Sequence, residues 1–177
     1  RGRPFAPRGS AWDSALTYWR SLKTEKNAVF DREINLNAKN IEPMVSWGNT
    51  AAETIGISGE IPDPKDTEDI DKRKSIQKAL EYMDLRPGTR MTDIKIDQVF
   101  IGSCTNGRLE DLRAAASIVK GKKARVPALV TPGSNKVRED AEKEGLAKIF
   151  EDAGFVWGQA GCSMCVSMNG DLVAKGH

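Results

Sequence analysis

The strongest constraint on the fold is a regular alternation of strand-like and helix-like segments between Ile94 and Trp157. The sequence predicts strands at 94–101, 128–131 and 155–157, separated by helices at 108–119 and 136–152. This alternation is typical of a parallel sheet with crossover helices packed on it. We therefore expect an α/β fold, a three-layer α/β/α arrangement with a mainly parallel sheet.

Several residues define the two predicted helices. Apolar residues recur at helical spacing along one side of the first: Leu109, Leu112, Ala116 and Val119. Ser134 follows a Pro-Gly turn, and we expect it to cap the second helix. Gly145 is a weak point inside that helix, and Gly154 is expected just beyond its end.

All three cysteines of the chain follow predicted strands of this sheet. Cys104 comes after the first strand, in VFIGSCTNGR, and Cys162 and Cys165 come after the last, in GCSMC. Parallel strands direct their carboxyl ends to one edge, so these thiols can meet in one crevice. We interpret them as the three protein ligands of one iron-sulfur cluster, which would leave one iron without a protein ligand. An open metal position of that kind supports Lewis-acid chemistry.

Spacing alone leaves other interpretations open. A CxxC pair is also found in redox dithiols, in zinc sites and among buried packing thiols. A closed zinc site needs four ligands, and besides the cysteines the chain has only His177, at its terminus. A thioredoxin-like dithiol would leave Cys104 unexplained.

The residues around the first cysteine add possible hydrogen-bond donors. Thr105 and Asn106 either donate to cluster sulfur or cap the following helix. Helix starts near Cys104 and at Ser134 would direct backbone N–H groups toward the same edge, where they would stabilise an anionic cluster and a carboxylate substrate.

The first half of the chain has a weaker pattern. A helix is expected from Ser10 as N-cap, then a strand at 28–36, a short extended piece at 41–47, a loop at 48–64 with a helical turn near 51–55, and a helix at 66–83. The first helix carries a stripe of the kind that usually packs in a core: Trp12, Leu16, Trp19 and Leu22. On the last, the apolar residues Ile70, Ile76, Leu80 and Met83 predict one buried side, and 69–74 is a solvated charge run. We expect 1–27 to be a helical lead-in from a preceding part of the protein and 28–177 to be the cluster-binding domain.

Composition narrows the class of protein. The 177 residues are 39% hydrophobic, enough for a core, and the net charge of +2 comes from interspersed charges, so neither nucleic acid nor a membrane is expected as partner. No apolar run approaches the ~20 residues of a membrane span. Three cysteines, an odd number, favour a reducing compartment, so we expect a cytoplasmic protein. The chain opens without Met, and we expect it to be a C-terminally truncated piece of a longer protein.

The segments SCTNGRLEDLRAA, PGS and GCSMC closely resemble the aconitase superfamily. Within it, RGRPFAPRGSAWDSALTYWRSLK, IEPMVSWG, IPDP and GCSMCVSMN are similar to the large subunits, or large-subunit halves, of 3-isopropylmalate dehydratases. The similarity covers essentially the whole chain. One departure is Ser167, where the family generally has Gly or Ala, which puts close packing beneath the cluster loop in question.

The resemblance implies a hydro-lyase of leucine biosynthesis that interconverts 2-isopropylmalate and 3-isopropylmalate. It implies a 4Fe-4S cluster on Cys104, Cys162 and Cys165, a small dicarboxylate substrate, and a catalytic serine from a small subunit or swivelling C-terminal domain. No catalytic base is expected within 1–177, so the fragment alone is expected to be inactive. The alternatives are homoaconitase or another aconitase-family hydratase and, in another class, an apo interaction module that docks through Trp12 and Trp19.

Overall fold

The computed structural model describes residues 1–173, and the chain divides into two units, Arg1–Met44 and a second that begins at Val45. The first unit contains helix α1 (Ser10–Ser21) and a 3₁₀ turn η1 (Ala38–Asn40). The helix starts where predicted, but its N-cap is Gly9 and no side chain caps it. The predicted domain boundary after residue 27 stays a prediction.

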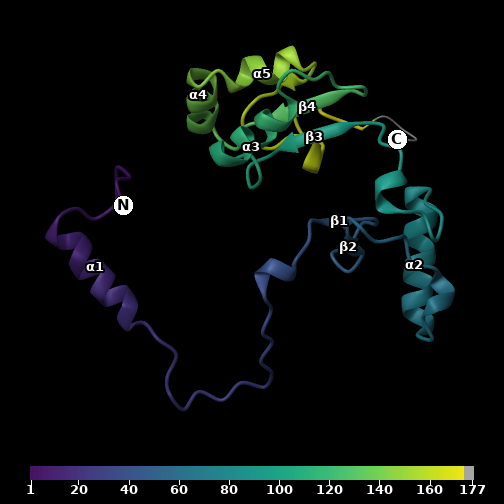
Figure 1. Ribbon diagram of the computed structural model, residues 1–177, viewed down its shortest axis with the longest axis horizontal. Helices are drawn as coiled ribbons and strands as arrows, with labels where there is room; N and C mark the ends of the chain where they lie inside the picture. The colour runs from purple at the N-terminus through teal and green to yellow at the C-terminus, as the bar shows by residue number, and fades with distance from the viewer. Residues whose placement is uncertain (174–177) are drawn as a thin grey trace. The chain divides into compact units, whose positions relative to one another are not determined.

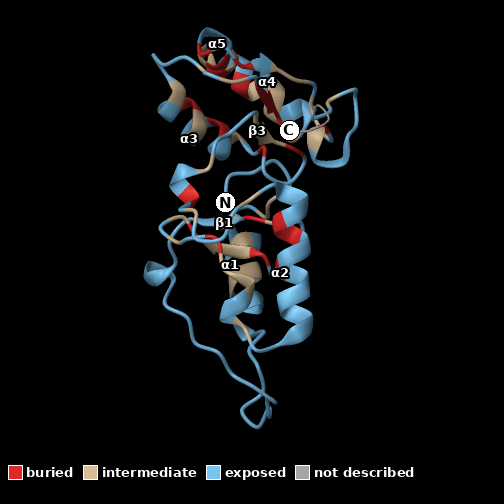
Figure 2. Ribbon diagram, turned by 90° about the vertical axis from the view of Figure 1, so that its right-hand side faces the viewer, coloured by how far each residue is buried: buried red, intermediate tan, exposed pale blue. Residues whose placement is uncertain are grey.

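The tryptophan stripe of α1 lies on the surface of its unit. Trp12 and Trp19 make an edge-to-face contact with ring centroids 5.9 Å apart, so they share one face as predicted. However, no residue of α1 is buried, and Figure 2 shows the helix without any buried position. The expectation that the stripe packs in a core is therefore wrong for the described residues.

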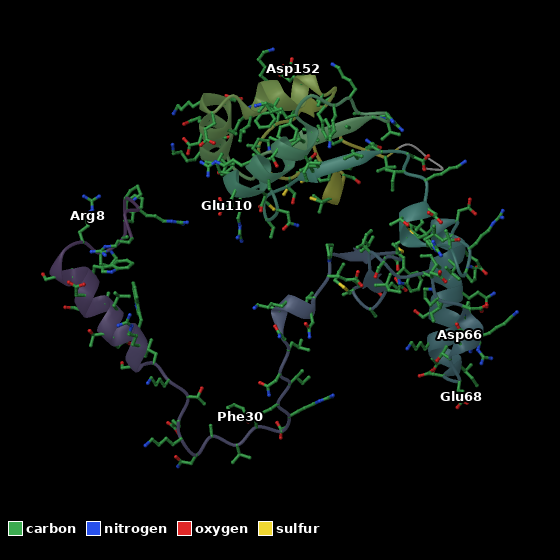
Figure 3. The ribbon with its side chains drawn as sticks, in the orientation of Figure 1. Arg8, Phe30, Asp66, Glu68, Glu110 and Asp152 are labelled. Atoms are coloured by element: carbon green, nitrogen blue, oxygen red, sulfur yellow. The ribbon has the colours of Figure 1, made fainter. Side chains whose placement is uncertain are left out.

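The predicted strand at 28–36 is absent. These residues, all within the described part of the chain, are irregular, and their apolar side chains are exposed, as Figure 3 shows for Phe30. A strand is stable only where a neighbouring strand takes up its backbone hydrogen bonds, and none pairs with this segment. Alternating hydrophobicity was therefore not sufficient to form a strand here.

The second unit begins with a short sheet and a helix. Strands β1 (Met44–Ser46) and β2 (Thr54–Gly56) pair in a two-stranded sheet. The first confirms an extended segment, whereas the helical turn expected near 51–55 is wrong. Trp47 N donates to the Glu53 carbonyl oxygen at 2.9 Å, which turns the chain so that the second strand returns beside the first.

Helix α2 (Ile70–Met83) follows the 3₁₀ turn η2 (Pro64–Asp66) and precedes η3 (Met91–Asp93). Asp69 caps it by accepting from the N–H groups of Asp71 and Lys72. Its charge run is exposed as predicted, but Ile70 and Met83 are exposed too, so the buried side is narrower than expected. The buried residues that form this core, partly visible in Figure 2, are Trp47, Ile61, Ile76, Ala79, Leu80 and Met91.

The sheet that carries the cysteine loops is parallel, as predicted. It consists of β3 (Val99–Gly102), β4 (Ala128–Thr131) and β5 (Val156–Trp157), in the order β3-β4-β5 with both pairs parallel (Figure 1). The middle strand has the predicted bounds and is buried throughout. The α/β fold class is thus confirmed.

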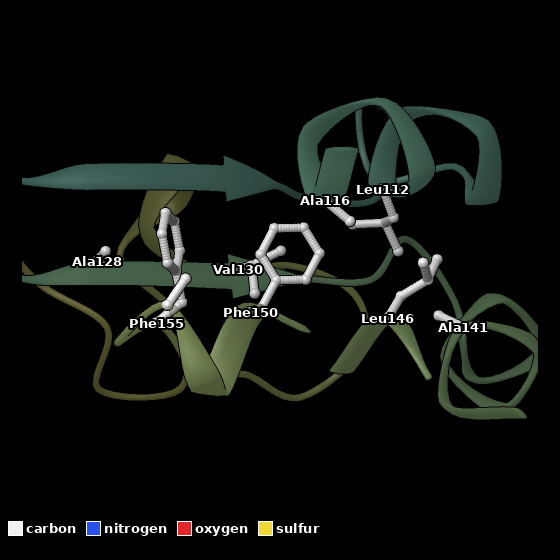
Figure 4. Close-up of a cluster of buried hydrophobic side chains, with 9 residues drawn as sticks. Leu112, Ala116, Ala128, Val130, Ala141, Leu146, Phe150 and Phe155 are labelled. Carbon is white, nitrogen blue, oxygen red and sulfur yellow. The ribbon is translucent and has the colours of Figure 1, made fainter. Parts of the chain in front are cut away.

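Three helices pack around this sheet: α3 (Leu109–Val119), α4 (Asn135–Lys143) and α5 (Leu146–Asp152). Ser134 caps α4, because its Oγ accepts from Val137 N at 3.2 Å. The single helix predicted at 136–152 is two helices, since Gly145 adopts a φ of 75° at the break. The core that joins sheet and helices is shown in Figure 4 and comprises Leu112, Ala116, Ala128, Val130, Ala141, Leu146, Phe150, Ala153 and Phe155.

None of the helices described between residues 1 and 173 combines the length and the apolar character needed to cross a bilayer.

Candidate functional site

Hydrogen bonds between backbone groups join the loops that leave the carboxyl ends of the three parallel strands. Gly133 N donates to the Gly107 carbonyl oxygen at 2.8 Å, which connects the β4 loop to the Cys104 loop. Gly161 N donates to the Pro132 carbonyl oxygen at 2.9 Å, which connects the β5 loop to the same β4 loop. The two cysteine-bearing loops are therefore both attached to the Pro132–Gly133 turn.

The first of these connections requires glycine. A Cβ atom at Gly107 would lie 2.6 Å from the Ser103 carbonyl oxygen and 2.7 Å from Gly133 N, closer than real Cβ contacts. Ser103 itself is buried and has a φ of 98°, a backbone angle that residues other than glycine rarely adopt. Cys104 thus follows a strained residue in a loop where two backbones approach closely.

The three thiols are unpaired and exposed. The pKa of the Cys162 thiol is raised, first by its hydrogen bond with Cys104, then by the charge of Cys104, by burial and by the charge of Cys165. The Cys104 sulfur also lies 3.9 Å from the Thr105 hydroxyl oxygen.

Thr105 and Asn106 form an exposed turn between the first cysteine and α3. The N-cap of that helix is Arg108, whose backbone N–H donates to Asp111 Oδ2 at 3.1 Å. Neither Thr105 nor Asn106 occupies the cap position. Their other proposed role, donation to cluster sulfur, stays a prediction.

A charged side chain of α4 fixes the loop that leads to the second motif. The Arg138 guanidinium donates to the Gly158 carbonyl oxygen at 3.3 Å and to Gln159 Oε1 at 2.8 Å. Glu142 accepts from Arg138 at 2.8 Å and from the Trp157 indole at 3.0 Å, and these bonds hold the pKa of its carboxyl below the usual value. Sequence reasoning missed this pair, because helical spacing shows only that Arg138 and Glu142 share a face.

Polar residues within and after the second motif were also missed. Ser163, Asn169 and Asp171 form hydrogen bonds that close the loop on itself. The signal available in the sequence was a polar Asn-Gly-Asp turn directly after the cysteine pair.

Ser167, which stands where the resembling family generally has Gly or Ala, differs in the cost of its backbone conformation. Ser167 is exposed, so its hydroxyl does not disturb packing beneath the loop. Its φ of 54° and ψ of 45° lie in the left-handed region, after the 3₁₀ turn η4 (Met164–Val166). Glycine adopts this conformation without strain, whereas serine does so at a cost.

The donor set suits an iron-sulfur cluster. Cysteine thiolates are the usual ligands of such clusters, and here three exposed thiols lie on adjoining loops, with α3 beginning shortly after the first of them. Among residues 1–173 no group of three or more Cys, His, Asp or Glu side chains is arranged around a single metal ion, and His177 lies outside the described residues. In a cluster the cysteines bind different irons, so one shared centre is not required.

The comparison with known protein families agrees with three cysteine ligands on the loops that follow the parallel strands. The model of the aconitase family (aconitate hydratase) matches residues 1–177, the full length of the sequence. It is a family of hydro-lyases whose members typically bind a 4Fe-4S cluster. The chain therefore belongs to the aconitase family.

Proposed function

We propose that this chain is the cluster-bearing part of a 3-isopropylmalate dehydratase large subunit, a hydro-lyase of leucine biosynthesis that interconverts 2-isopropylmalate and 3-isopropylmalate. Membership of the aconitase family supports the hydro-lyase class. The narrower assignment is supported by the similarity of IEPMVSWG, IPDP and GCSMCVSMN to large subunits of that enzyme. Three free thiols also favour a reducing compartment, and we propose the cytoplasm.

The observation that carries the proposal is that backbone hydrogen bonds attach both cysteine-bearing loops to the Pro132–Gly133 turn. On these loops Cys104, Cys162 and Cys165 would hold a 4Fe-4S cluster, which when bound supplies a Lewis acid that polarises the substrate hydroxyl. The protein residues hold and orient the reactants around it. Thr105 and Asn106, exposed beside Cys104, would donate hydrogen bonds to sulfur.

Helix starts at this edge would bind the substrate carboxylates. The first N–H groups of a helix have no carbonyl partner in a preceding turn, and the positive ends of the helix dipoles favour anions. At the start of α4, the Ser134 hydroxyl takes up the N–H group of Val137. A dicarboxylate held there would be oriented for loss of its hydroxyl group. The proton from the neighbouring carbon requires a base, which we propose is a serine of the small subunit or of a swivelling domain.

Anaerobic reconstitution with iron and sulfide tests the cluster. We expect close to four irons per chain by analogy with the 4Fe-4S type, and loss of the visible cluster absorption in Cys104→Ala, Cys162→Ala and Cys165→Ala. Ser117→Ala, an exposed hydroxyl deletion on α3, is the control and should keep its iron. An unchanged iron content in Cys104→Ala would refute the three-ligand assignment.

The substrate is tested in the assembled enzyme. With its small subunit or swivelling domain, the protein should interconvert the two isopropylmalates in preference to other hydroxy di- and tricarboxylates. Preference for a longer tricarboxylate would instead favour homoaconitase. A protein that stays free of metal after reconstitution would support the non-catalytic alternative, and turnover by residues 1–177 alone would contradict the proposed source of the base.

A further inference from the structure

The loop that carries Cys162 and Cys165 buries a serine side chain instead of an apolar one. Ser163 is completely buried, although Cys162 and Cys165 on either side of it are exposed. The apolar residues that follow are largely solvent-accessible, with Val166 59% and Leu172 61% exposed. Burial of apolar surface therefore contributes little to holding this loop in place.

Packing against the sheet does not fix the loop either. A pocket of about 320 Å³ that is open to solvent lies between them, lined by Leu129 and Val156 from the strands and by Met164 and Leu172 from the loop side. Side chains across an open pocket make few van der Waals contacts with one another. Other interactions must determine the position of the loop.

Those interactions are hydrogen bonds from the residues that follow the motif. The Ser163 hydroxyl donates to Asp171 Oδ2 at 2.6 Å, and Met168 N donates to the Ser163 carbonyl oxygen at 3.1 Å. Asn169 has a φ of 59°, a conformation that asparagine tolerates, and its Nδ2 donates to the Cys162 carbonyl oxygen at 2.7 Å. The chain thus folds back and contacts the motif at Cys162 and at Ser163.

We propose that Ser163, Asn169 and Asp171 are positioning residues that set the placement of Cys162 and Cys165 for cluster binding. This inference rests on the proposed function, because it assigns the three residues a role toward the same metal centre. Iron–thiolate bonds need defined sulfur positions, and partners outside the ligand set commonly supply that definition. The carboxylate makes the strongest contribution, since a hydrogen bond to a charged acceptor is stronger than one between neutral groups.

The first test needs no metal. In the unreconstituted chain, amide hydrogen exchange of residues 162–171 should be faster in Asp171→Ala and Ser163→Ala than in the wild type, with exchange in β3 and β4 unchanged. Asp171→Asn should exchange more slowly than Asp171→Ala but faster than the wild type, because its amide oxygen still accepts from the serine hydroxyl without the charge. Glu151→Gln, an exposed substitution on α5, is the control. Unchanged exchange in Asp171→Ala would overturn the proposal.

The second test follows the cluster through its visible absorption during challenge with an iron chelator. Asp171→Ala and Ser163→Ala should release iron roughly tenfold faster than the wild type, the order of magnitude of one charge-assisted hydrogen bond. The double variant should be no faster than either single variant, because both remove the same bond. Asn169→Asp, which cannot donate to the Cys162 carbonyl, should also release iron faster, whereas Asp171→Asn, which keeps the hydrogen bond but not the charge, should fall between the wild type and Asp171→Ala. Additive effects, or wild-type release from Asp171→Ala, would overturn the proposal.

The two tests separate this inference from the proposed function. A wild-type chain that takes up no iron refutes the cluster assignment, and with it the positioning role, even if the exchange pattern shows that the hydrogen bonds hold the loop. A wild-type chain that binds iron while all three variants keep wild-type release rates refutes only the positioning role.

Discussion

Substitution of Gly107 by alanine tests whether the crossing of two backbones supports the first cysteine loop. The new Cβ would meet the carbonyl oxygens of Ser103 and Thr131 and the amide nitrogen of Gly133, at 2.6 to 2.7 Å. All three are backbone atoms, so no side chain can rotate away, and they would have to retreat to the 3.4 Å at which ordinary contact begins.

The magnitude follows from two costs. Forcing one extra carbon into a closely packed place costs about 1–3 kcal/mol, and loss of the Gly133–Gly107 hydrogen bond adds about 1 kcal/mol. Reduced freedom of the unfolded chain offsets at most about 1 kcal/mol of this. We therefore expect the free energy of unfolding to fall by about 1–3 kcal/mol.

The assay is urea unfolding of the chain followed by circular dichroism, together with iron content after reconstitution. Gly121→Ala is the control for iron uptake: no atom lies within 4 Å of its new Cβ, so it adds a methyl group without a clash, and its φ of 74° adds a backbone cost that Gly107 does not carry. Gly107→Ala should lower iron uptake, because Cys104 lies three residues before it in the same loop, and Gly121→Ala should not. A loss of stability below about 0.5 kcal/mol, the range of ordinary surface substitutions, would refute the reasoning.

Three further substitutions test individual residues of the same region. Thr131 has a buried hydroxyl without a hydrogen-bond partner in the structure, so Thr131→Val should raise the free energy of unfolding by about 1 kcal/mol or more in urea unfolding; a lower value would show that the hydroxyl has a partner. Ser167→Gly should stabilise the chain by about 1 kcal/mol, because it removes the cost of a left-handed backbone, and no gain would contradict that assignment. The pKa of Glu142 is held below its ordinary value of 4.5, chiefly by Arg138 and then by Trp157, so the folded state binds fewer protons than the unfolded state in that range. The stability that the Glu142 carboxylate contributes is present above pH 4.5 and is lost as the pH falls through the folded pKa. In Glu142→Gln the urea midpoint should therefore depend less steeply on acidic pH than in the wild type. Equal slopes would contradict the stabilising contact of Glu142 with Arg138 and Trp157.

Several features of the fold followed from the sequence because they depend on local chemistry. The middle strand 128–131, the apolar side of α3 and the cap at Ser134 were predicted from apolar runs, helical spacing and a turn before a serine. The parallel direction of the strands followed as well, since short strands separated by helices permit few other connections. The position of each cysteine at the end of a strand is a consequence of that order.

Predictions from the local sequence pattern were wrong where pairing with another segment decides the secondary structure. The alternation at 28–36 predicts a strand, but no neighbouring strand accepts its hydrogen bonds in the described residues. The segment near 51–55 was predicted to be a helical turn, yet from Thr54 onward it pairs with β1 as a strand. Gly145 was identified as a weak point, but only the packed structure shows that the helix ends there and a new one begins.

The sequence by itself determined that three thiols follow strands of one parallel sheet, because residue types and their order are enough to specify strand ends. Only the tertiary structure decided how the loops are held. The Gly107–Gly133 crossing, the Arg138 contact with Gly158 and the Ser163–Asp171 hydrogen bond join groups whose distances depend on how the chain folds back. Hydrogen bonds act over a narrow range of distance and angle, and residue order does not specify either.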